Sequence, residues 1–139
     1  MRLLIDTNVI LDMVLKRKNC DMSMRLFQTV RESGADAYIT ASSVTDLFYI
    51  IRKETHDTER TYVIMENIFG LVKVLSVTEK DIMDAFGKKW KDFEDCVQYM
   101  SGKNNQINYI VTVNQKDYED TQIPALTPQE CIGMINSRR

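Results

Sequence analysis

Residues 1–16, MRLLIDTNVILDMVLK, join a short apolar run to an acidic residue and then to a helical pattern. The run Arg2–Ile5 has the length and composition of a buried β-strand. Thr7 or Asn8 then has the residue type of a helix N-cap. The apolar residues that follow have the spacing of a buried helix face: Val9, Ile10, Met13 and Val14. Packing poorly explains a carboxylate at the end of such a strand, so Asp6 is the first candidate for a functional residue.

Short apolar strands and amphipathic helices alternate through the rest of the chain. Further strands are predicted over residues 37–40, 72–77, 109–113 and 123–126, and helices over residues 21–33, 43–51, 61–71, 79–86 and 93–102 and from residue 128. Strands separated by helical crossovers form a right-handed parallel sheet that helices cover on both faces. We therefore predict an α/β fold in which residues 1–139 form a single domain.

The composition is that of an ordinary globular protein, with 44% hydrophobic and 27% charged residues. No apolar run approaches the ~18 residues of a membrane span, so no membrane partner is expected. The three cysteines, Cys20, Cys96 and Cys131, are far apart and form no C-x-x-C pair. This arrangement indicates neither a disulfide framework nor a thiolate zinc site. The cytoplasm is the expected location.

The charge balance and the single histidine exclude several function classes. A net charge of -2 argues against a protein that coats nucleic acid by bulk electrostatics. His56 is the only histidine, so a ribonuclease that uses a histidine pair as acid and base is excluded. His56 lies in a polar stretch typical of a surface loop, which also argues against a Ser-His-Asp triad. The five glycines are scattered, and none forms a phosphate-binding loop.

Acidic residues recur where predicted strands end or the following helices begin. Asp46 lies one turn into the helix after the second strand, Asp92 and Asp95 open a later helix, and Asp117 follows the fourth strand. As an alternative, Ser43 to Asp46 fits a variant capping box, and Asp92 fits an N-cap with Asp95 at N3. The carboxyl ends of parallel strands share one edge of a sheet, where ligands bind. The combination with the strand-end acid therefore favours a carboxylate cluster.

Carboxylates brought within a few ångströms of one another repel, and some stay protonated unless a cation neutralises them. Oxygen ligands without histidine or cysteine partners favour Mg²⁺ or Mn²⁺ over zinc. Such ions activate a water nucleophile and stabilise charge on a phosphate. The pattern therefore indicates metal-dependent chemistry on an anionic backbone.

Five segments, in order, resemble the motifs of PIN-domain nucleases. They are LIDTNVILD (4–12), TASSVTDL (40–47), DFEDCVQY (92–99), IVTVNQKDY (110–118) and IPALTPQE (123–130). The resemblance implies a three-layer α/β/α sandwich with a five-stranded parallel sheet. It also implies a Mg²⁺- or Mn²⁺-dependent endoribonuclease that hydrolyses RNA phosphodiester bonds. Members of the VapC type are often homodimers and toxins of a toxin-antitoxin pair, so an antitoxin partner and a homodimer are expected.

The resemblance assigns catalytic and metal-binding roles to Asp6, Asp46, Asp95 and Asp117. Asp6 and Asp95 are the leading metal ligands. Asp46 stands where relatives more often have glutamate, so direct binding and binding through water both stay open. The fourth position is also open between Asn114, where many members have aspartate, and Asp117. The number of metal ions is not fixed by these residues.

Two other functions are compatible with parts of this pattern. The first is an inactive PIN-like module that binds RNA or protein, in which Asp46 and Asn114 mark the decay of the metal site. The second is a phosphoacceptor receiver domain, which also gathers acids at strand ends. That fold needs a lysine after its last strand, and residues 123–128 contain none.

Overall fold

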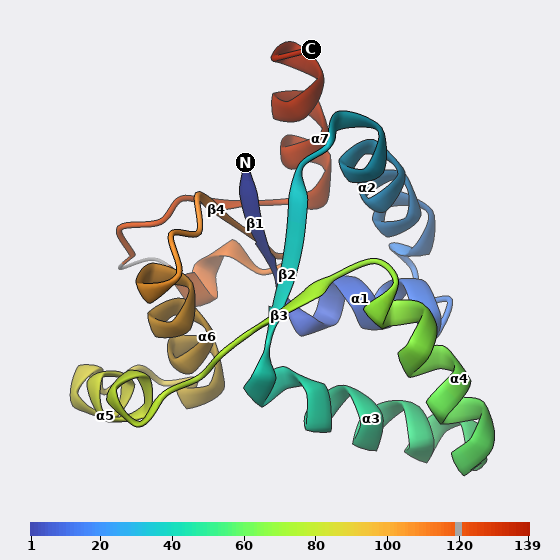
Figure 1. Ribbon diagram of the computed structural model, residues 1–139, viewed down its shortest axis with the longest axis horizontal. Coiled ribbons are helices and arrows are strands. Elements are labelled where there is room, and N and C mark those ends of the chain that lie inside the picture. The colour runs from blue at the N-terminus through green and yellow to red at the C-terminus, as the bar shows by residue number, and fades with distance from the viewer. Residues whose placement is uncertain (119–120) are drawn as a thin grey trace.

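Five parallel strands form the centre of the fold, in the order β3-β2-β1-β4-β5 (Figure 1). The computed structural model describes residues 1–118 and 121–139. The strands are β1 (Arg2–Ile5), β2 (Asp36–Thr40), β3 (Lys73–Leu75), β4 (Tyr109–Val111) and β5 (Ala125–Leu126). In the register of the sheet, Leu4 of β1 pairs with Tyr38 on one side and with Ile110 on the other. The predicted parallel sheet is confirmed.

Helices cover both faces of this sheet. They are α1 (Thr7–Val14), α2 (Cys20–Ser33), α3 (Ala41–Thr55), α4 (Thr58–Phe69), α5 (Glu79–Lys88), α6 (Phe93–Asn104) and α7 (Pro128–Ser137), with a 3-10 turn, η1 (Gln115–Tyr118). Figure 1 shows α5 and α6 on one side of the strands and the other helices on the opposite side. The three-layer α/β/α architecture is therefore confirmed. Within the described residues, no helix is long and apolar enough to cross a membrane.

Alternate residues of β1 belong to two separate cores. Leu3 and Ile5 are buried in the core beneath α1, α2, α3, α4 and α7. Leu4 points to the other face, into the core beneath α5 and α6. At Gly102 of α6, an added Cβ would lie 3.0 Å from the Leu4 Cδ2 atom. The absence of a side chain at Gly102 therefore lets the C-terminal end of α6 lie close to the central strand.

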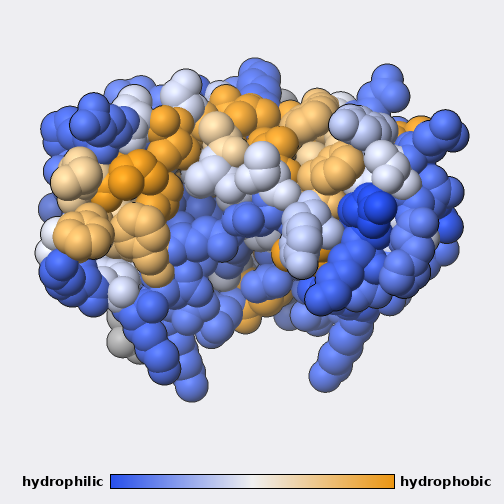
Figure 2. Space-filling view, turned by 90° about the horizontal axis from the view of Figure 1, so that it is seen from below, coloured by the Kyte–Doolittle hydropathy of each residue, from blue (hydrophilic) through white to orange (hydrophobic). Residues whose placement is uncertain are grey.

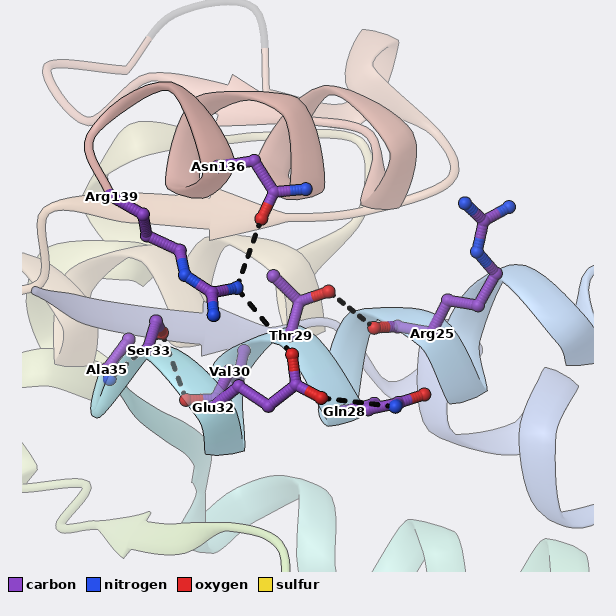
Figure 3. Close-up of polar contacts among 9 residues, drawn as sticks. All are labelled: Arg25, Gln28, Thr29, Val30, Glu32, Ser33, Ala35, Asn136 and Arg139. Atoms are coloured by element: carbon purple, nitrogen blue, oxygen red, sulfur yellow. Dashed lines mark hydrogen bonds and ion pairs between the residues drawn. The ribbon is translucent and has the colours of Figure 1, made fainter.

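The C-terminal helix α7 packs along α2 (Figure 3). Arg139 Nη1 lies 3.6 Å from Glu32 Oε2 and 3.3 Å from Asn136 Oδ1, and Gln28 Nε2 donates to Glu32 Oε1 at 3.2 Å. Exposed ion pairs of this kind contribute about 0–1 kcal/mol. The contact is therefore held mainly by buried apolar side chains such as Ile135.

The predicted N-cap of α1, Thr7 or Asn8, is wrong. Thr7 is already helical, and Asp6 occupies the cap position with extended backbone angles (φ -66°, ψ 146°). β1 runs into α1 without a loop, so the residue after the strand is the cap. The Asp6 side chain makes no capping hydrogen bond, and its carboxylate is available to other partners.

The alternative interpretation of Ser43 to Asp46 as a capping box is also wrong. β2 runs directly into α3, which begins at Ala41 with Thr40 as N-cap. Ser43 Oγ lies 2.8 Å from Thr40 Oγ1, in a bond between two side chains. Asp46 therefore lies within the helix and has no capping role.

Candidate active site

The carboxyl ends of β1 and β4 lie side by side, and a polar residue follows each strand. The backbone N–H of Asp6 donates to the Val111 carbonyl at 2.9 Å. The Thr112 Oγ1 hydroxyl, which follows β4, donates to Asp6 Oδ2 at 2.8 Å. Asp6 is 4% exposed and Thr112 is fully buried. The pairing of the two strands therefore fixes the position of the Asp6 carboxylate.

Asp95 reaches the same place from the first turn of α6. The Asp92 side chain caps this helix by accepting the Asp95 backbone N–H at 3.0 Å, as predicted. Asp95 Oδ1 accepts hydrogen bonds from Tyr118 OH at 3.3 Å and from Gln98 Nε2 at 3.4 Å. Gln98 Nε2 also lies 3.5 Å from Asp6 Oδ1. The structure thus brings Asp6 and Asp95 to a single amide group.

Asp46 acts on the pKa of a carboxyl group that the sequence did not predict for the site, that of Glu94 on α6. Glu94 as a whole residue is exposed, but its carboxyl group is partly removed from water. This desolvation raises its pKa to about 7, together with a hydrogen bond with Asp46 and the charges of Asp46, Asp92 and Asp6. Successive residues of a helix point about 100° apart, which separates the direction of Glu94 from that of Asp95. In the sequence, the one feature that could have pointed to Glu94 is its position between the predicted acids Asp92 and Asp95.

The two candidates for the fourth position are hydrogen-bonded to each other. Asn114 Nδ2 donates to Asp117 Oδ2 at 2.8 Å, and the Asn114 backbone N–H donates to Thr112 Oγ1 at 3.1 Å. Both residues are exposed at the rim. The Asp117 charge raises the pKa of Asp6 and of Asp95. Asp117 therefore adds charge to the cluster, and Asn114 links it to the residue beside Asp6.

Burial and mutual repulsion disfavour the ionised carboxylates. Burial, followed by the charges of Asp6, Asp92 and Asp117, raises the pKa of Asp95 to about 8. Burial also raises the pKa of Asp6, against the opposing effect of hydrogen bonds from Thr112 and Gln98. In the described parts of the chain, the ion pairs are Lys73–Asp36, Lys80–Asp84 and Arg139–Glu32, and none includes a carboxylate of this cluster.

The donor set fits a hard divalent cation. It consists of carboxylate oxygens, and the buried Gln98 Oε1 beside them has no hydrogen-bond partner among the residues described. A cation favours ionised carboxylates, and so opposes the raised pKa values. Across residues 1–118 and 121–139, no three Asp, Glu, His or Cys side chains lie close enough together to hold an ion. Mg²⁺ commonly uses only one or two carboxylates together with waters, and Asp6 and Asp95 form such a pair.

Two neutral residues of the site also escaped prediction. Gln98 lies three residues after Asp95 and therefore on the same helix face, which was the available signal. Tyr118 directly follows the predicted Asp117 and is 3% exposed. Burial raises the pKa of the Tyr118 phenol, so the group stays protonated and donates to Asp95.

Comparison with known proteins gives relatives of similar length. The chain is 26% identical over 136 residues to "Ribonuclease VapC1" of Aquifex aeolicus (strain VF5), covering 93% of this chain and 92% of that protein. Its fold is similar to a chain of VapBC2 from Rickettsia felis bound to promoter DNA (TM-score 0.71, 12% identity, 91% of this chain and 98% of that chain). It is also similar to a chain of VapBC-1 from nontypeable Haemophilus influenzae (TM-score 0.68, 16% identity, 93% of this chain and 99% of that chain).

A family model described as "PIN domain" matches residues 2–116. This match spans β1 to β4 and includes Asp6, Asp46 and Asp95. The order of the strands and the carboxylates at their ends agree with the motifs that the sequence presented. The chain belongs to the PIN domain family.

Proposed function

We propose that this chain is a Mg²⁺- or Mn²⁺-dependent endoribonuclease that hydrolyses RNA phosphodiester bonds in the cytoplasm. The observation that carries the proposal is the pair Asp6 and Asp95, which are buried, hydrogen-bonded to one amide and unneutralised by any cation of the described chain. The similarity to a protein named as a ribonuclease supports it. The proposal treats residues 1–139 as one domain, since β1 and β5 belong to one sheet.

In this proposal, Asp6 and Asp95 hold the cation. When bound, a divalent cation neutralises phosphate charge and lowers the pKa of water, which supplies a nucleophile at neutral pH. Thr112 and Tyr118 hold the two carboxylates by donating to them. Asp117 completes the rim of the site. Asp46, on α3, adds a carboxylate next to Glu94 at the edge of the cluster.

Positively charged side chains that could bind the RNA backbone lie next to the acidic site in the chain. Lys88, Lys89 and Lys91 lie at the connection between α5 and α6, immediately before Asp92, and all three are exposed. In this proposal the three lysines contact phosphates of the RNA backbone, and such contacts provide affinity without sequence preference. The exposed ring of Phe93 offers a surface on which a base can stack.

Replacing Asp6 tests the proposal. Asp6→Asn keeps the size of the side chain and removes a metal-binding charge. We expect cleavage of unstructured RNA in Mn²⁺ to fall at least about 100-fold, the upper end of what loss of an outer-shell partner costs. The thermal stabilisation of the wild type by Mn²⁺ should disappear as well. A wild type that neither cleaves varied RNAs nor is stabilised by Mn²⁺ would instead identify a PIN-like binding module.

We also propose that the chain is the toxin of a toxin-antitoxin pair. The chains of similar fold include those of the VapBC assemblies of Rickettsia felis and Haemophilus influenzae. An open groove of about 710 Å³ along α2 offers a place for a partner segment and is lined by Met13, Asp21, Met24, Arg25, Phe27, Gln28, Arg31 and Leu71. A small DNA-binding protein encoded next to this chain, which co-purifies with it when both are expressed, is the expected result.

A homodimer is part of the same proposal. Apolar side chains are exposed on α5: Ile82, Met83 and Phe86. Figure 2, which views the side toward which the strands run, shows hydrophobic residues gathered along one edge of this face and hydrophilic residues at its centre. Exposed apolar surface of this kind marks interaction sites. We propose that a second copy of this chain covers this apolar surface of α5.

A further inference from the structure

Gln98 is, within residues 1–118 and 121–139, the single side chain that hydrogen-bonds to both Asp6 and Asp95. It is 1% exposed. Its Nε2 atom lies 3.5 Å from Asp6 Oδ1 and 3.4 Å from Asp95 Oδ1. Its Oε1 atom is buried and has no hydrogen-bond partner in the described chain. The amide is thus turned so that its nitrogen serves the two carboxylates while its oxygen stays unpaired.

Packing alone does not account for a glutamine here. An unpaired buried oxygen lowers stability, and an apolar side chain of the same size would fill the space without it. The adjacent residues Val97 and Tyr99 belong to the core beneath α5 and α6. What glutamine adds is a neutral NH₂ group with two hydrogens, one for each carboxylate. It therefore separates the two acids without placing a competing positive charge between them.

We propose that Gln98 is a positioning residue that holds the Asp6 and Asp95 carboxylates at a fixed separation for a divalent cation. The inference rests on the proposed function, because it takes these two acids as the metal ligands. Thr112 holds Asp6 from the side of β4, and Tyr118 holds Asp95 from η1. Gln98 links these two halves into one buried row of hydrogen bonds, in which each donor is neutral.

A metal-binding measurement separates this role from a purely structural one. Gln98→Met keeps the length and approximate volume of the side chain and removes both polar atoms. We expect the affinity for Mn²⁺ alone, measured by isothermal titration calorimetry, to fall about 10- to 100-fold, as for other residues that orient metal ligands. The metal-free variant should unfold cooperatively with a Tm close to that of the wild type. Gln98→Leu repeats the measurement with a branched apolar side chain.

Ser101→Ala is the matched control. Ser101 is buried on the same helix and donates to the Ser76 carbonyl at 2.8 Å, so its loss removes a buried hydrogen bond away from the carboxylates. We expect this variant to have a lower Tm and unchanged Mn²⁺ affinity. Equal loss of affinity in both variants, or wild-type affinity in Gln98→Met and Gln98→Leu, overturns the positioning role and leaves the proposed nuclease intact. A wild type that binds no Mn²⁺ overturns both.

Discussion

Thr112 and Asp6 are 106 residues apart in the chain, yet the Thr112 hydroxyl donates to the Asp6 carboxylate at 2.8 Å inside the protein. The register of β1 and β4, in which Ile5 pairs with Val111, places the two residues next to each other. The bond lowers the pKa of Asp6 and so opposes the effect of its burial. The Thr112 hydroxyl therefore favours the ionised form of the buried Asp6 carboxylate.

Replacing this hydroxyl should change both stability and pH dependence. Thr112→Val removes the donor, which raises the pKa of Asp6 further. We expect RNA cleavage in Mn²⁺ to require a higher pH than in the wild type. The free energy of unfolding, from denaturant titration, should fall by about 1–3 kcal/mol, the cost of a buried partner left unpaired. A pH–rate profile that superimposes on that of the wild type would contradict this role.

The raised pKa values predict that the metal-free protein loses stability as the pH rises. The Asp95 pKa is raised from 3.8 to about 8. The protonated carboxyl is therefore favoured by folding, and its stabilising contribution is complete below about pH 4 and is lost as the pH rises to about 8. Thermal unfolding in EDTA across this range should show the decline. Asp95→Asn should flatten it, and saturating Mn²⁺ should reduce it in the wild type alone.

The effect of Asp46 on the Glu94 pKa predicts that removing the Asp46 charge changes the titration of Glu94. In Asp46→Asn, the loss of the neighbouring charge should lower the Glu94 pKa from about 7 toward its ordinary value of 4.5. Carbon-13 NMR of the glutamate side chains measures this directly. Asp36→Asn, which removes the partner of Lys73 instead, should leave the Glu94 titration unchanged. An unaltered Glu94 pKa in Asp46→Asn would show that the two carboxyls do not interact.

The lysines between α5 and α6 should contribute to RNA affinity but not to cleavage chemistry. Combined replacement of Lys88, Lys89 and Lys91 by alanine should weaken RNA binding in EDTA. It should also reduce the slope of log K against log salt by up to about 2, from about 0.7 for each phosphate contact on a single strand. Lys103→Ala, at the other end of α6, is the control. Equal salt slopes for the wild type and the triple variant would place the RNA elsewhere.

The apolar surface of α5 predicts a dimer that charge can disrupt. In light scattering, the wild type should have about twice the mass of the 16.2 kDa chain, as expected where an interface buries about 1,000 Å² or more. Met83→Glu with Phe86→Glu should give a monomer, and Met24→Glu on α2 should not. A wild type that is monomeric at all concentrations would contradict the homodimer.

The sequence predicted the acids of the site better than the residues that hold them. Asp6 was recognisable because a carboxylate at the end of an apolar strand has few structural explanations. Asp95 carried a helix-start signal as well. The capping box at Ser43 failed because β2 enters α3 without a loop, which local residue preferences do not reveal. Gln98 and Glu94 acquire their partners only when α6 lies against β1 and α3, and these contacts depend on the tertiary fold.

The pairing of β1 with β4 determines when the candidate site can form during synthesis. β1 is synthesised before β4, and more than a hundred residues separate the two strands. The hydroxyl of Thr112, the amide of Gln98 and the phenol of Tyr118 all follow Asp6 by about ninety residues or more. Contacts between such distant segments form late in folding. The hydrogen bonds that hold the Asp6 carboxylate therefore cannot form until these later segments have been synthesised.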